Sequence, residues 1–113
     1  MKFLLETNGG SWPDCTPEEL DNAVLAMLAD WEEFAVLAPE KPVGALNIRF
    51  MQAARYPEGV RVEFSLRIGG QWRIYFRHYG EGSRVLQLFE DFYAAGLAPD
   101  FDEYELDPKI FPD

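Results

Sequence analysis

The stretch from Val60 to Tyr79, VRVEFSLRIGGQWRIYFRHY, decides the fold. Its first half carries an apolar residue at every second position, which is the period of a strand with one buried face. Gly69-Gly70 then marks a turn, and a second run of strand-forming residues follows. The stretch therefore predicts an antiparallel hairpin.

Two registers are compatible with this hairpin. A two-residue turn would align Leu66 with Arg73, whereas a three-residue loop that includes Gln71 would align Leu66 with Ile74. Because only the second arrangement pairs apolar side chains across the strands, we predict the three-residue loop. That register directs four side chains of the second strand away from the core: Arg73, Tyr75, Arg77 and Tyr79.

The sequence before the hairpin predicts a helix and two more strands. The segment Thr16-Pro17-Glu18-Glu19 combines an N-cap threonine, a first-turn proline and a glutamate that completes a capping box. Apolar residues follow at helical spacing and predict a core-facing stripe: Leu20, Ala23, Val24, Met27, Leu28 and Trp31. Phe34–Leu37 is typical of a short strand, and Leu46, Ile48 and Phe50 alternate with polar residues as one face of the next.

The sequence after the hairpin predicts a second helix and an acidic end. Ser83 is the expected N-cap, Gly96 the left-handed stop, and one apolar face lies between them: Val85, Leu88, Phe89 and Phe92. We therefore expect residues 1–113 to form one α+β domain, with 97–113 as an acidic extension packed on it. The expected architecture has two layers, an antiparallel meander of about four to five strands with two main helices on one face.

Charge is segregated along the chain. The net charge is −10, yet residues 46–84 are at +4 and each flank is at −7. The strand alternation places Arg49, Arg61 and Arg67 on the face predicted for the outward residues of the second hairpin strand. This face is interpreted either as a solvated sheet surface or as a protein contact, since arginine and tyrosine are enriched at interface hot spots. The acidic end suits a basic partner, with Asp100, Asp102, Glu103 and Glu105 as the expected contacts.

Residues for catalysis are sparse. His78 is the only histidine and Cys15 the only cysteine, so neither a multi-histidine metal site nor an internal disulfide is possible. We expect no enzyme activity, cofactor or metal. The acidic charge disfavours direct binding of nucleic acid. The apolar runs are too short for a membrane span or a signal peptide, which makes the cytoplasm the expected location.

Four segments give the chain a resemblance to a known family: Gly10-Ser11-Trp12-Pro13, Phe50–Ala53, Val62–Arg67 and Val85–Tyr93. Between residues 9 and 95 the sequence is similar to small acidic α+β immunity proteins of bacterial polymorphic-toxin and contact-dependent competition systems. The resemblance implies a non-enzymatic inhibitor that occludes one cognate toxin.

Two other functions remain open. The acidity also fits a phage-type protein that mimics DNA to block a defence enzyme. A small enzyme, or a small homodimeric ligand-binding domain, would instead need a pocket around His78, Tyr75 and Gln52. The inhibitor hypothesis predicts a basic protein toxin as the partner.

Overall fold

The computed structural model describes residues 1–111; the last two residues of the predicted 97–113 extension lie outside the described part. The elements are β1 (Phe3–Thr7), β2 (Gly10–Trp12), α1 (Pro17–Leu28), β3 (Phe34–Pro39), β4 (Phe50–Tyr56), β5 (Gly59–Ile68), β6 (Gln71–Tyr79), α2 (Gly82–Ala95), the 3₁₀ turn η1 (Phe101–Glu103) and β7 (Glu105–Leu106). Within residues 1–111, one sheet contains seven strands in the order β2-β1-β3-β4-β5-β6-β7.

The α+β class and the antiparallel sheet are confirmed, because every neighbouring pair of strands is antiparallel. The predicted strand number was too low. Its error lies at the two edges of the sheet, where β2 has three residues and β7 has two. Segments this short carry no readable alternation.

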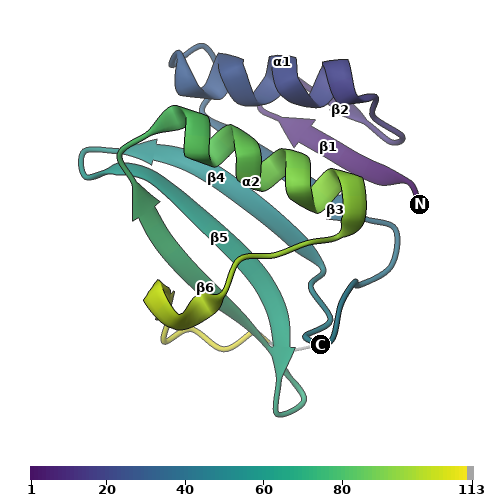
Figure 1. Ribbon diagram of the computed structural model, residues 1–113, viewed down its shortest axis with the longest axis vertical. Helices are drawn as coiled ribbons and strands as arrows, with labels where there is room; N and C mark the ends of the chain where they lie inside the picture. The colour runs from purple at the N-terminus through teal and green to yellow at the C-terminus, as the bar shows by residue number, and fades with distance from the viewer. Residues whose placement is uncertain (112–113) are drawn as a thin grey trace.

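Both helices pack on the same side of the sheet, which we call the helix side (Figure 1). Thr16 caps α1 and forms the predicted capping box with Glu19. The stripe is buried as far as Met27, but α1 ends at Leu28 and Asp30 adopts a φ of 66°. Trp31 is consequently 84% exposed, so its predicted place in the core was wrong.

Helix α2 buries the predicted face, with Val85, Leu88, Phe89 and Phe92 inaccessible or nearly so. Gly96 ends it in the left-handed region, as expected. The N-cap is Glu81 and makes no side-chain hydrogen bond, so the assignment of Ser83 to that position was wrong. In the part of the chain that the structure describes, no helix is long and apolar enough to cross a membrane.

The hairpin between β5 and β6 has the register that we rejected. Ile68 is aligned with Gln71 and Leu66 with Arg73, so the turn is Gly69-Gly70 alone. Both glycines have positive φ, 57° and 79°, which a two-residue hairpin turn of this type requires. Turn geometry therefore fixes the register, and the three-residue loop was wrong.

This register reverses the two faces of β6. Four side chains lie on the helix side instead of facing away from the core: Arg73, Tyr75, Arg77 and Tyr79. Trp72, Ile74, Phe76 and His78 lie on the opposite side, which we call the outer face. The prediction that Arg73, Tyr75, Arg77 and Tyr79 share one outward face with Arg49, Arg61 and Arg67 was therefore wrong.

The C-terminal segment provides partners for the polar groups that the register turns toward the helix side. Arg73 donates to the backbone carbonyls of Asp107 and Lys109. Arg77 forms an ion pair with Glu103 at 2.7 Å. The Tyr79 and Tyr104 hydroxyls form a buried hydrogen bond of 2.6 Å. We expected these side chains of β6 to contact another protein, but their partners lie within the chain.

A second irregularity lies where β4 begins. Phe50 is aligned with Ser65, and the Arg49 N–H also donates to the Ser65 carbonyl, so two residues oppose one as in a β-bulge. Phe50 therefore lies on the outer face, against its predicted position, and Met51 takes the buried place. The Arg49 guanidinium also reaches the outer face, where Nε donates to Ser65 Oγ at 2.8 Å.

Cys15 is a buried thiol at the junction of the N-terminal hairpin and α1. Its carbonyl accepts a hydrogen bond from the Tyr93 hydroxyl at 2.7 Å. Burial, reinforced by the Glu19 carboxylate, raises the pKa of the thiol to about 11. The native state therefore holds the neutral thiol, which contributes stability below the unfolded-state pKa.

We expect this contribution to be lost as the pH rises from 9 to about 11, the interval between the ordinary and the native pKa of Cys15. Urea unfolding at steps of pH across that interval measures the loss. In the Cys15→Ala variant the decline should be shallower. Parallel declines in both proteins would show that the thiol does not couple to folding. The raised pKa of Tyr104, caused mainly by burial, leaves a residual decline in both.

Candidate functional site: an apolar groove with an acidic rim

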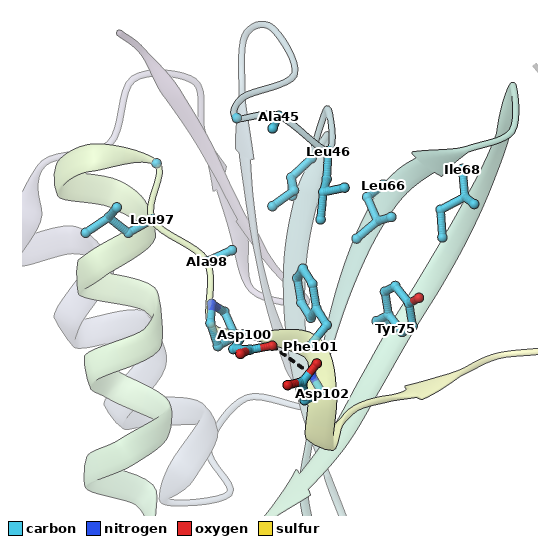
Figure 2. A pocket seen from close by; sticks show the side chains of 14 residues that line it. Ala45, Leu46, Leu66, Ile68, Tyr75, Leu97, Ala98, Asp100, Phe101 and Asp102 are labelled. Carbon is cyan, nitrogen blue, oxygen red and sulfur yellow. Dashed lines mark hydrogen bonds between the residues drawn. The ribbon is translucent and has the colours of Figure 1, made fainter.

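A groove of about 660 Å³ opens on the helix side where α2 no longer covers the sheet. Three segments far apart in the sequence form it: residues 44–48, the β5–β6 end of the sheet and residues 96–102. Figure 2 shows Ala98 directed toward the side where Leu46, Leu66 and Ile68 lie, whereas the Leu97 side chain extends over the end of α2 at the edge of the groove. The lining is mostly aliphatic and aromatic, which is the composition of a surface that binds other apolar groups.

The wall at 96–102 is held by aromatic packing. After Gly96 reverses the chain, Phe101 stacks on Tyr75 with ring centroids 5.2 Å apart and meets Phe64 edge-on at 5.4 Å. Asp100 caps η1 by accepting a hydrogen bond from the Asp102 N–H at 3.0 Å. These contacts fix the wall before any partner binds, so binding need not order it.

The opposite wall is a closed loop. Val43 and Ile48 exchange two backbone hydrogen bonds of 3.0 and 2.9 Å, and the intervening turn uses Gly44 and Asn47 at positive φ. The Leu46 carbonyl accepts from the Arg67 N–H, which attaches the loop to β5. Ile48 is thereby buried at the base of the groove, and Leu46 is left on its lip.

Two leucines on the lips remain largely in water. Leu46 is 44% exposed and Leu97 is 60% exposed. Leu97 also borders a second hollow, of about 790 Å³, whose lining includes Phe3, Val43 and the exposed Met1. Exposed apolar side chains that gather around neighbouring hollows, rather than standing singly, are typical of an interaction site.

Carboxylates stand on the rim of the groove. Asp100 and Asp102 are exposed and belong to the lining, next to the apolar wall. Of the residues predicted to bind a partner, these two and Tyr75 come together at the groove. Glu103 is used by the ion pair with Arg77, and Glu105 is aligned with Phe76 and so lies on the outer face.

The other arginines that we predicted to bind a partner lie together on the outer face, where their side chains contact neighbouring residues of the same face. The Arg49 guanidinium lies 4.4 Å and that of Arg67 5.2 Å from the centroid of the Trp72 ring. Arg61 lies 3.7 Å over Phe76 and also contacts the carboxylates of Glu63 at 2.6 Å and Asp107 at 3.0 Å. Cation–π contacts and ion pairs therefore engage these side chains within the chain.

The predicted pocket around His78, Tyr75 and Gln52 is not formed. His78 lies on the outer face, with Nε2 3.4 Å from Glu58 and its ring edge-on to Tyr56, whereas Tyr75 lies on the helix side. Gln52 donates to Glu63. Within residues 1–111 no group of three or more His, Cys, Asp or Glu side chains is placed to hold a metal ion.

Sequence reasoning did not find Leu46 and Leu97. Leu46 was predicted on one face of a strand, but β4 begins only at Phe50 and Leu46 lies in the turn between Val43 and Ile48, so that prediction was wrong. For Leu97 a signal was present, because it follows Gly96 beyond the helical pattern, where an apolar residue has no helix or strand to bury it. Comparisons with models of protein families, with curated proteins and with solved structures gave no significant match.

Proposed function

We propose that this chain is a non-enzymatic protein-binding domain, an immunity-type inhibitor that neutralises a cognate bacterial toxin in the cytoplasm by covering part of its surface. The groove carries the proposal. It offers a fixed apolar surface with two exposed leucines, and burying one such side chain contributes about 1.5–3 kcal/mol. Anchors of this size in a preformed depression are what an interface hot spot needs.

The charge supports a basic partner. A protein at −10 attracts cationic surfaces over several ångströms and repels nucleic acid, so complementary charge accelerates the encounter and excludes wrong partners. The rim carboxylates Asp100 and Asp102 stand beside the apolar lining. The proposed occupant is therefore a segment of the toxin with large apolar side chains flanked by lysine or arginine.

A charge placed on the lip of the groove tests this proposal. The Leu97→Asp variant should lose partner affinity by at least about 30-fold, equivalent to about 2 kcal/mol, because binding would bury a carboxylate against apolar surface. The measurement is affinity capture from the native lysate at low salt, with mass spectrometry of the bound proteins. Leu25→Asp is the matched control, since Leu25 is 50% exposed on α1 and outside the groove.

Recovery of one stoichiometric basic protein by the wild type and by Leu25→Asp, but not by Leu97→Asp, would support the proposal. Equal capture by all three proteins would contradict a role for the groove. The inhibitor role itself requires a further result: co-expression with the wild type, but not with Leu97→Asp, must restore growth to cells that make the captured protein.

The volume of the groove favours one second candidate. About 660 Å³ falls within the size range of small-molecule sites, so an apolar ligand could occupy it in a ligand-binding domain. That function predicts that a panel of fatty acids and aromatic compounds raises the thermal midpoint, and that capture recovers no protein other than the chain itself.

A further inference from the structure

The turn after α1 exposes a tryptophan on a backbone that hydrogen bonds hold in place. Trp31 is 84% exposed, and its backbone N–H donates to the Ala26 carbonyl at 2.8 Å. On its far side the Glu33 N–H donates to the Asn8 side chain at 2.8 Å. The backbone on both sides of the indole is thus tied to the rest of the domain. A large apolar ring held in water contributes nothing to the core, and tryptophan is the residue most enriched at hot spots.

A hollow of about 220 Å³ lies next to this turn, lined by Thr7, Trp12, Glu19, Asn22, Ala23, Ala26 and Glu32. Its lining joins an indole ring to two carboxylates. Within residues 1–111, the buried Oε2 atom of Glu32 has no hydrogen-bond partner. A carboxylate oxygen that is withdrawn from water without a partner is destabilising, and a cation placed against it offsets that cost.

We infer that the hollow and the Trp31 turn bind a lysine or arginine side chain of a basic protein, with Glu32 as its counter-ion. A cation is attracted to the face of an indole more than to any other aromatic ring, and the lining of the hollow supplies the indole of Trp12. Trp31 precedes Glu32 in the adjoining turn and offers a second, exposed indole. The acids that flank Trp31, namely Asp30, Glu32 and Glu33, favour the same partner charge.

The inference rests on the protein binding proposed above but not on the groove. In Figure 1 the longest axis is vertical, with α1 at the top and the β5–β6 hairpin that borders the groove at the bottom. The Trp31 turn is therefore a separate contact, and variants at the two places should act independently.

The probe is an octa-arginine peptide, titrated at low salt and followed by the indole N–H signals in two-dimensional NMR spectra. The Trp31 signal should shift on titration. Glu32→Gln should weaken the peptide about tenfold, because it removes the counter-ion, whereas Glu33→Gln makes the same charge change in the same turn and should alter the affinity less than about twofold. Trp31→Ala should weaken binding by about three- to tenfold.

Equal losses in Glu32→Gln and Glu33→Gln, with an unmoved Trp31 signal, would overturn the inference, because the peptide would then report only net charge. The groove variant Leu97→Asp separates the two proposals. If it still abolishes partner capture while Glu32→Gln leaves the peptide affinity unchanged, the inference fails and the proposed function stands. If Glu32→Gln weakens the peptide while Leu97→Asp retains the partner, the groove proposal fails and the cation site stands.

Discussion

The Phe64→Ala variant is expected to lose about 3–5 kcal/mol of unfolding free energy. Phe64 is fully buried on β5, and its ring meets three others edge-on: Phe92 at 6.0 Å, Phe101 at 5.4 Å and Tyr104 at 6.0 Å. One side chain thus joins the sheet to α2 and to the C-terminal wall of the groove. Removal of the ring leaves a cavity between the sheet, α2 and the C-terminal wall. Urea unfolding at neutral pH measures the resulting decrease in the free energy of unfolding.

Phe64→Leu serves as the control, since it keeps most of the volume and should cost less than half as much. A decrease of under about 1 kcal/mol in Phe64→Ala would contradict the packing described, because it would mean that the neighbouring side chains relax to fill the cavity. The same substitution should also lower the affinity of the groove for its partner. Partner capture by Phe64→Ala should fall even at temperatures where the variant stays folded, since Phe101 loses one of the rings that hold it.

Gly59→Ala should produce the other large loss, about 3 kcal/mol. Gly59 opens β5 with a φ of 126°, a backbone conformation that is almost confined to glycine. A Cβ at this position would also lie 2.6 Å from the Tyr79 carbonyl oxygen. That oxygen belongs to the backbone of a neighbouring strand and cannot turn aside as a side chain would.

Gly80→Ala is the matched control for this prediction. Gly80 lies one residue beyond the same β6 carbonyl, has no positive φ, and a Cβ there would meet no atom within 4 Å. Its substitution should change the free energy of unfolding by less than about 0.5 kcal/mol. Similar losses from Gly59→Ala and Gly80→Ala would mean that the turn before β5 tolerates a side chain, against the geometry described. Thermal unfolding followed by circular dichroism compares the two.

Local signals predicted much of the fold correctly. The capping box at Thr16, the alternation from Val62 to Leu66 and the buried face of α2 each depend on residues within one turn or one strand. Such features depend on residues that are close in the sequence, so they can be predicted from the sequence alone.

The faces of β6 could not be read in the same way. The alternation of Trp72, Ile74 and Phe76 favours packing of that set against the helices, yet these side chains lie on the outer face. There the rings of Trp72 and Phe76 lie under arginine guanidinium groups. Arg73 and Arg77 are tolerated on the helix side because the C-terminal segment offers them carbonyl and carboxylate partners. Those partners lie about 30 residues further along the chain, so side-chain chemistry within the hairpin gave the wrong register.

The groove could not be predicted from the sequence. It depends on where α2 stops covering the sheet and on the meeting of residues 44–48 with residues 96–102. Composition indicated an acidic binding surface and pointed to Asp100 and Asp102, but the apolar surface beside them required the three-dimensional arrangement. The bulge at Arg49 could not be predicted from the sequence either. One extra residue there moves every following side chain of β4 to the opposite face.

Amide hydrogen exchange of the complex with the captured partner tests the central claim most directly. Residues 44–48 and 96–102 form the two walls of the groove, and most of them lie in loops outside the helices and strands. If a toxin segment occupies the groove, exchange in both segments should slow by at least tenfold in the saturated complex. Unchanged exchange in both segments, with a saturated partner protecting another part of the chain, would contradict the account.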